Sequence, residues 1–268
     1  MERRGVFERL AVRALTRWNH SALAKRVVWW FVRSVSHTWI HASTRNRLRI
    51  TGMEAVAALD PPRGVLLVAN HRSFWDMYIA TSVLTAHTGF AQSFYFPVRS
   101  AFFYSNPIGV LVNLLVAGGS MWPAMVRGFD RAGHNAAALE ELARILDTPH
   151  RLAGIHPEGT RSKTADPMDF VPAKGGAGRL LLACHPDVVV IPLFLTGLSN
   201  DLPREIARNF RRPGRRGPAI RLAWGTPIRA GELQATGASA VEVARDLLDR
   251  CRRLGAAMAP PPSDPPQV

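Results

Sequence analysis

Lysine and cysteine are scarce in this sequence. Lysine occurs only at Lys25, Lys163 and Lys174, so arginine carries almost all of the net charge of +14. Cys184 and Cys251 lie far apart and match no spacing of metal ligands. A disulfide framework or a metal site is therefore not expected, and a reducing compartment is the simplest environment for the chain.

Long uninterrupted hydrophobic runs are also missing. Five arginines within the first 17 residues would break the apolar core of a signal peptide, so none is expected. The mean hydropathy of -0.01 argues against a polytopic membrane protein. Residues 77–98 and 100–126 contain no Asp, Glu, Lys or Arg, but proline, glycine and asparagine interrupt both stretches. We expect buried core with an apolar groove or a membrane-facing surface there, rather than a span.

The excess of positive charge implies an anionic partner, which is either a phospholipid surface or nucleic acid. Composition alone does not choose between the two. The first 50 residues contain eleven Lys and Arg, only two Glu, and four of the seven tryptophans. Apolar residues recur among them at helical spacing, which predicts one or two amphipathic helices: Val27, Val28, Phe31, Val35 and Trp39.

A basic helix with tryptophan anchors suits the headgroup region of an anionic membrane, and an ordinary helix packed on the core is the alternative. Lys25, Arg26 and Arg33 would each cost about 2.5–3.5 kcal/mol near the bilayer centre, so the segment is not expected to span. The aromatic residues match no RNA- or DNA-binding signature. We therefore favour a membrane partner and expect no nucleic acid.

Strands and helices are predicted to alternate along the rest of the chain. The expected strands are 64–69, 91–98, 151–155, 187–195 and 220–224, and the expected helices are 74–87, 133–147, 175–184 and 239–254. Pro192 argues against a central position for its strand. The arginine-rich residues 204–221 are expected to form a surface loop.

This alternation predicts an α/β fold, a three-layer domain with a central, mostly parallel or mixed sheet, preceded by N-terminal amphipathic helices. We divide the chain into membrane-associating helices at 1–47, an α/β domain at 48–256 and a disordered proline-rich tail at 257–268.

A histidine and a carboxylate stand five positions apart, at His71 and Asp76. On one continuous helix they would be rotated by about 140° and would not meet. They can meet if His71 lies in a strand-to-helix turn and the helix begins near Arg72 or Ser73. An aspartate on one imidazole nitrogen would then fix the tautomer and leave the other nitrogen to take a proton. The alternative is a turn histidine beside a capping aspartate.

A second polar cluster follows the strand expected at 151–155. Gly159 allows a sharp turn, and Arg161 offers a bidentate fork for phosphate or carboxylate. Glu158 either accepts bonds from a substrate hydroxyl or holds Arg161 in place. An ordinary Pro-Glu-Gly turn with a surface ion pair is the alternative. No sequence typical of a covalent serine or cysteine nucleophile is present.

Both clusters resemble motifs of the lysophospholipid (1-acylglycerol-3-phosphate) acyltransferases. Asn-His-Arg-Ser-Phe-Trp-Asp at 70–76 resembles their His-x-x-x-x-Asp block, and Ile-His-Pro-Glu-Gly-Thr-Arg-Ser at 155–162 is similar to their Phe-Pro-Glu-Gly-Thr-Arg-Ser block. Smaller likenesses bring the similarity to residues 48–230. His156 replaces the usual Phe, and only Phe129-Asp130-Arg131 represents an intermediate block.

The resemblance implies transfer of an acyl group from an acyl-CoA or acyl-carrier-protein thioester to the free hydroxyl of a lysolipid. His71 would be the general base and Asp76 would orient it. Glu158, Gly159, Thr160 and Arg161, with Arg131 and Arg99, would bind the substrate phosphate. No bound cofactor is implied. Acylation of another lysolipid, such as lyso-ornithine lipid, and a non-enzymatic lipid-binding protein are the alternatives. The implied location is the cytoplasmic face of the membrane, as a peripheral or monotopic protein.

Overall fold

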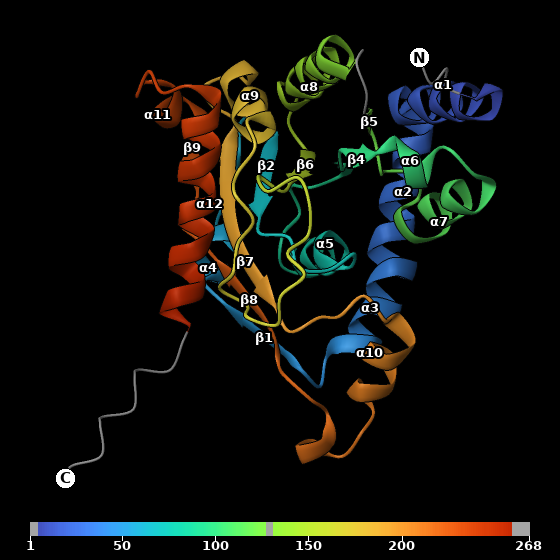
Figure 1. The fold of residues 1–268 in the computed structure, drawn as a ribbon, viewed down its shortest axis with the longest axis vertical. Coiled ribbons are helices and arrows are strands. Elements are labelled where there is room, and N and C mark those ends of the chain that lie inside the picture. Colours follow the sequence, from blue (N-terminus) through green and yellow to red (C-terminus); the bar gives the residue numbers. More distant parts are fainter. Residues whose placement is uncertain (1–4, 127–130, 259–268) are drawn as a thin grey trace.

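The computed structural model describes residues 5–126 and 131–258. A central sheet is covered by helices on both faces, which confirms the predicted three-layer α/β architecture (Figure 1). The predicted tail at 257–268 falls almost entirely outside the described residues, as do the first four residues of the N-terminal segment.

The helices and strands that the sequence predicts follow one another in the expected order. Additional elements lie between them, among them an 11-residue helix at Pro107–Ala117. The strands are β1 (Leu48–Thr51), β2 (Val65–Ala69), β3 (Ser93–Tyr95), β4 (Val98–Arg99), β5 (Ala124–Met125), β6 (Arg151–Ile155), β7 (Val189–Thr196), β8 (Ile220–Trp224) and β9 (Ile228–Arg229). The helices are α1 (Val6–His20), α2 (Ala22–Phe31), the π-helix η1 (Val32–Ser36), α3 (His37–Thr44), α4 (Met53–Ala57), α5 (Asp76–His87), α6 (Ser100–Phe103), α7 (Pro107–Ala117), α8 (Arg131–Leu146), α9 (Gly176–Ala183), α10 (Leu202–Asn209), the 3₁₀ turn η2 (Pro213–Arg215), α11 (Ala230–Gln234) and α12 (Ala240–Ala257).

The main sheet has the order β1-β8-β7-β2-β6-β3, with β9 paired to β7. Most pairs are parallel, and β7 is antiparallel to both β8 and β9. Pro192 lies in the central strand β7, so the prediction of a non-central strand is wrong. The reason is a gap on one side of β7: β9 pairs with Val189 and Val190, β8 pairs from Leu193 onward, and Pro192 falls between them.

Strand β2 shows how the two cores form on opposite faces of the sheet. Its five residues are all buried, and alternate side chains point to opposite faces. Val65 and Leu67 join a cluster with α5 and the N-terminal helices, whereas Leu66 and Val68 join a cluster with α8, α9 and α12. Burial on both faces explains the continuous apolar run in the sequence.

The N-terminal helices pack on the sheet layer through a buried lysine. The Lys25 ammonium donates to Asn19 Oδ1 at 2.6 Å and to the Phe94 carbonyl at 2.8 Å, and lies 3.7 Å from the centre of the Tyr95 ring. Burial lowers its pKa well below the usual value. Val28 is buried here while Val27 is half exposed, so the apolar stripe predicted from the sequence divides between two faces of the helix.

One further segment differs from the expectations. Residues 202–209 of the arginine-rich segment form α10, because Asp201 caps the helix by accepting from the Arg204 amide. None of the helices in the described ranges is both long and apolar enough to cross a membrane.

Candidate active site

The two predicted polar clusters meet at one edge of the sheet. Strands β2 and β6 are parallel neighbours, with Val68 opposite Ile155. Their carboxyl ends therefore deliver residues 70–76 and 156–162 to the same place. The Ser162 amide donates to the His71 carbonyl at 3.0 Å, which joins the two loops directly.

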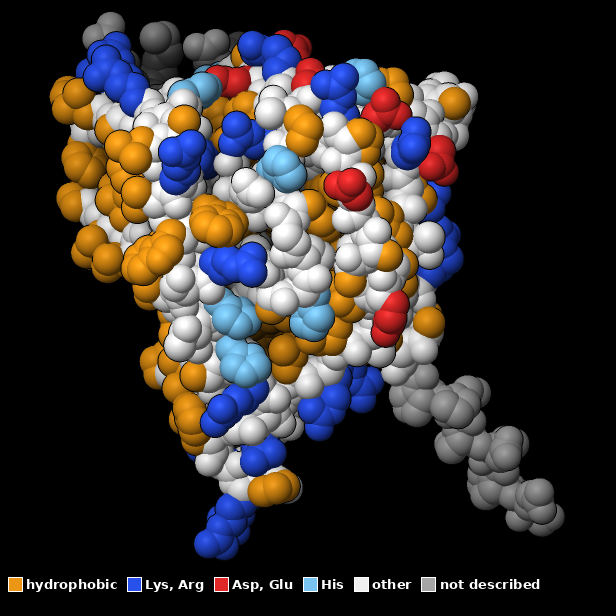
Figure 2. Space-filling model, turned by 180° about the vertical axis from the view of Figure 1, so that it is seen from behind, with side chains coloured by type: hydrophobic (Ala, Val, Ile, Leu, Met, Phe, Trp, Pro, Cys, Tyr) orange, Lys and Arg blue, Asp and Glu red, His pale blue; other side chains and the backbone are white. Residues whose placement is uncertain are grey.

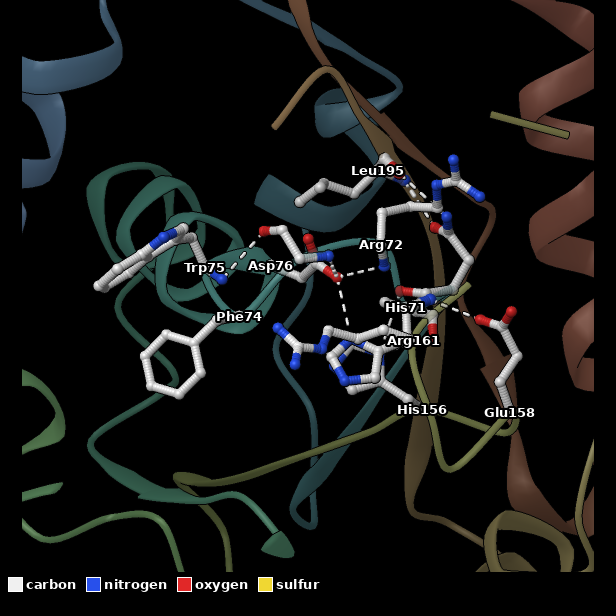
Figure 3. Close-up of polar contacts among 12 residues, drawn as sticks. His71, Arg72, Phe74, Trp75, Asp76, His156, Glu158, Arg161 and Leu195 are labelled. Atoms are coloured by element: carbon white, nitrogen blue, oxygen red, sulfur yellow. Dashed lines mark hydrogen bonds and ion pairs between the residues drawn. The ribbon is translucent and has the colours of Figure 1, made fainter. Parts of the chain in front are cut away.

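His71 and Asp76 form the hydrogen-bonded pair that the spacing allows (Figure 3). His71 Nδ1 lies 3.1 Å from Asp76 Oδ2. The carboxylate is a hydrogen-bond acceptor, so Nδ1 carries the proton and Nε2 presents its lone pair. The aspartate side chain is 1% exposed and the histidine side chain 22% exposed, which leaves the ring open to a ligand on one side. This arrangement can take a proton from a hydroxyl.

The turn between β2 and α5 is built around the Asp76 carboxylate. Its Oδ2 also accepts from the backbone amides of Arg72 and Ser73, at 2.7 and 2.9 Å. The helix starts at Asp76, four and three residues later than the expected start near Arg72 or Ser73. The reason is that these amides bond to the carboxylate, which holds the chain in a turn before the helix begins.

Glu158 lies beneath the His71 loop and is fully buried. One carboxylate oxygen accepts from the His71 amide at 2.5 Å and the other from the Val171 amide at 2.8 Å. Burial raises its pKa, and the two amide bonds oppose that rise. The carboxylate is thus occupied by backbone, whereas the sequence suggested a substrate hydroxyl or Arg161 as its partner. Glu158 therefore fixes the backbone of the loop that carries His71.

Arg161 lies in the loop that follows β6, and its side chain is exposed. One guanidinium nitrogen donates to Asn200 Oδ1 at 2.5 Å. Asn200 also accepts from the Phe74 amide. Arg99 joins the same loop by donating to the Gly159 carbonyl at 2.7 Å. Gly159 has a φ of 59°, the left-handed region that favours glycine. The structure therefore brings two arginines to one turn.

Thr160 and Arg131 are the remaining residues that the sequence predicts to bind the substrate. Thr160 is partly exposed between Gly159 and Arg161. Arg131 is the first residue of α8, but its side chain lies outside the described part of the chain, so its predicted contact stays a prediction.

His156 brings a second imidazole into the site. Its ring is stacked on that of His71, with centroids 3.9 Å apart and planes 8° from parallel. Ligand-type atoms of His71, Asp76 and His156 lie within 4.8 Å of one another. Parallel stacked rings direct their lone pairs side by side and not toward a common point, and Asp76 Oδ2 already accepts three hydrogen bonds. The three residues therefore form a hydrogen-bonded, stacked group whose geometry does not suit a metal ion.

Two asparagines hold this site through bonds that the sequence did not predict. Asn70 bonds through its side chain to both the amide and the carbonyl of Leu195, at 2.8 and 2.9 Å, and so fixes the end of β2 to β7. Asn200 orients Arg161. Asn70 opens the motif at 70–76, whereas the only sequence signal for Asn200 is its place shortly after the carboxyl end of a strand.

Comparisons with known proteins agree with this geometry. The family model described as Acyltransferase matches residues 47–196, which is more than half of the chain. A search of curated proteins found no match. Among solved structures, the chain resembles the 1-acyl-sn-glycerophosphate (LPA) acyltransferase PlsC from Thermotoga maritima, with a TM-score of 0.50 and 16% sequence identity, over 92% of this chain and 88% of that one.

At that identity the likeness concerns the fold, and the family match concerns the segment from β1 to β7 that contains both loops of the site. It follows that this chain belongs to the acyltransferase family and is an acyl-transferring enzyme.

Proposed function

We propose that the enzyme transfers a fatty acyl group from an acyl-CoA or acyl-carrier-protein thioester to the free hydroxyl of a lysophospholipid such as 1-acylglycerol-3-phosphate. The observation that carries the proposal is the His71–Asp76 pair, with an available Nε2, beside a loop that holds Arg161 and Arg99. A base and an anion-binding group side by side suit an acceptor that has both a hydroxyl and a phosphate.

The reaction needs a base because a neutral hydroxyl is a poor nucleophile. His71 Nε2 accepts the hydroxyl proton while the oxygen attacks the thioester carbonyl, and Asp76 stabilises the imidazolium that forms. The carbon–sulfur bond then breaks, and the thiolate leaves with the proton that His71 releases. The acyl group passes directly to the acceptor oxygen, without an acyl-enzyme.

The phosphate of the acceptor would bind at the Gly159–Arg161 turn. The Arg161 guanidinium offers paired donors to a phosphate, and within the described residues it makes one hydrogen bond, to Asn200. Arg99 adds positive charge from the adjacent β4. Glu158 acts here as a positioning residue, because both of its oxygens hold backbone amides.

We propose that the acyl chain binds next to the catalytic loop, in the layer between α5 and the N-terminal helices. Two small hollows lie in this layer. One, between α3, α5 and α10, is lined by Trp39, Trp75 and Tyr78 among others, and the second, between η1, α5 and α7, also includes Tyr78. Each hollow is smaller than an acyl chain, so the helices would have to move apart to admit one. The scarcity of charge in residues 77–126 fits this role.

A surface for an anionic membrane lies on the helices at one edge of the molecule. In Figure 2, hydrophobic side chains gather along the edge that α1, α2 and α7 form in Figure 1. We call this surface the apolar face; its exposed residues are Val6, Phe7, Leu10, Leu23, Val27, Trp30, Ile108, Leu111 and Leu115. Exposed arginines of α1 and α2 accompany it: Arg13, Arg17 and Arg26. Apolar residues with nearby arginines are typical of interfacial binding.

This surface would hold the enzyme on the membrane that contains its acceptor. Because acyl-CoA and acyl-carrier protein are intracellular donors, we propose the cytoplasmic face of the membrane as its location. The proposal includes no nucleic-acid partner and no bound cofactor.

A lipid panel tests the function. Purified protein is incubated with vesicles containing lysophosphatidate, lysophosphatidylinositol or lyso-ornithine lipid, each with acyl-CoA or acyl-carrier protein, and the products are identified by mass spectrometry. We expect a diacyl product with at least one phosphate-bearing acceptor, and none with His71→Ala. Acylation of lyso-ornithine lipid alone would overturn the assignment of a phospholipid acceptor, and no product from any lysolipid would overturn the proposed substrate class.

A further inference from the structure

The second imidazole of the site, that of His156, is held in place both by its ring and by its Nδ1. Because Val68 of β2 lies opposite Ile155 of β6, the next residues of both strands meet at the sheet edge. His156 thereby comes under His71, with the two rings 3.9 Å apart and within 8° of parallel (Figure 3). The stack covers one face of the His71 ring, while Asp76 holds that ring at its edge.

His156 also holds the backbone that leads into His71. Its Nδ1 lies 3.0 Å from the carbonyl oxygens of both Ala69 and Asn70. Carbonyl oxygens only accept hydrogen bonds, so Nδ1 must carry the proton and Nε2 must be the unprotonated nitrogen. The two carbonyls are the last ones before His71. One side chain thus fixes both the ring of the base and the chain from which that ring extends.

The surroundings keep His156 uncharged. Burial lowers its pKa to about 3, and the neighbouring His71 adds to the lowering, while Asp76 and the two carbonyls oppose it. A neutral ring can lie against the His71 imidazolium that forms during transfer, whereas a second charged ring at 3.9 Å would repel it.

We propose that His156 is a positioning residue for the general base: its ring supports the face of His71, and its Nδ1–H fixes the carbonyls of Ala69 and Asn70. The inference rests on the proposed function, because it assumes that His71 is the base. A phenylalanine at this position would supply the ring face and no N–H, so the two parts of the role can be separated by substitution.

Three variants test the two parts. His156→Phe keeps an aromatic face and removes the N–H, His156→Gln keeps an N–H donor and removes the ring, and His156→Ala removes both. We expect kcat to fall about tenfold in each of the first two and about a hundredfold in His156→Ala, with the KM of donor and acceptor changed by no more than about twofold. A fall in kcat at constant KM separates a role in positioning the base from a role in binding substrate.

A measurement on the wild-type enzyme does not depend on whether the variants fold. Nitrogen-15 spectra of the histidines should show His156 protonated at Nδ1 and not at Nε2 from pH 5 to pH 9. A His156 that titrates in this range, or that carries its proton on Nε2, would overturn the proposal.

His71→Ala separates this inference from the proposed function. If His71→Ala retains wild-type transfer, the proposed mechanism fails and the role of His156 fails with it. If His71→Ala is inactive while folded His156→Ala keeps the wild-type kcat, the inference about His156 alone is contradicted.

Discussion

The loops around His71 and the apolar face are built in opposite ways. The His71 loop is fixed from several sides, by Glu158 below, by the Ser162 amide and by Asn200 at Phe74. The apolar face instead leaves large side chains without packing partners, among them Leu23 and Ile108, which are 72% and 71% exposed. Proton transfer requires atoms held to fractions of an ångström, whereas contact with a lipid surface requires mainly apolar area.

The difference predicts that the two regions can be disabled separately. Changes in the loops should reduce transfer and leave vesicle binding intact. Changes on the apolar face should weaken vesicle binding, and should slow transfer only because less enzyme is bound to the membrane.

Asp76→Asn should have the largest effect. The amide can present an N–H toward His71 Nδ1 and so favour the wrong tautomer, and it also weakens the acceptor for the Arg72 and Ser73 amides. We expect kcat to fall by about 10²–10⁴-fold, measured with saturating donor and acceptor. Vesicle binding measured by co-sedimentation should not change. A kcat within threefold of wild type would show that this carboxylate does not set the state of the imidazole.

Arg161→Ala should come next, with an effect on acceptor binding. Loss of the guanidinium should raise the acceptor KM by about ten- to a hundredfold, because charge-assisted bonds to phosphate are lost. Arg161→Lys should recover part of the loss, since it keeps the charge without the paired donors. Arg179→Ala, which changes an exposed arginine on α9, is the matched control. An unchanged acceptor KM in Arg161→Ala would place the headgroup elsewhere.

Changes on the apolar face should act through membrane binding. The double variant Ile108→Ser/Leu115→Ser removes two side chains that are 71% and 62% exposed on α7. We expect vesicle partitioning to weaken by about tenfold or more, because less apolar area enters the interface. Val241→Ser, at a half-exposed residue of α12 on the other side of the sheet, should bind as the wild type does. Equal binding by the double variant would remove α7 from the proposed surface.

Lys25 joins the N-terminal helices to β3 and, within the described residues, makes no hydrogen bond to the catalytic loops, so its substitution should have the smallest effect on transfer. Lys25→Met removes the hydrogen bonds to the Phe94 carbonyl and to Asn19, which should lower the free energy of unfolding by about 1–3 kcal/mol at pH 7. The folded-state pKa of Lys25 lies below its usual 10.5, so the folded protein loses the proton first and the wild type should gain stability as pH rises toward 10.5. Urea unfolding of the wild type and of Lys25→Met at pH 7 and pH 9 measures both free energies of unfolding. We expect the difference between them to be larger at pH 9, and a smaller difference at pH 9 would contradict the argument.

The sequence predicts the parts of this molecule that depend on local pattern. The buried run at 64–69 predicts β2, and a strand followed by a turn predicts the meeting of His71 with Asp76. What the sequence could not show depends on register between distant strands. The stacking of His156 on His71 follows from the pairing of Val68 with Ile155, and Pro192 fits a central strand only because β8 and β9 leave a gap beside it.

The most direct test of the account measures transfer and membrane binding on the same vesicles, for wild type and His71→Ala. The vesicles contain anionic phospholipid and the lysolipid that the wild type uses, and each sample is divided between a product assay and co-sedimentation. The account predicts that His71→Ala binds as the wild type does and transfers at least a hundredfold more slowly. Transfer by the bound variant at the wild-type rate would contradict it.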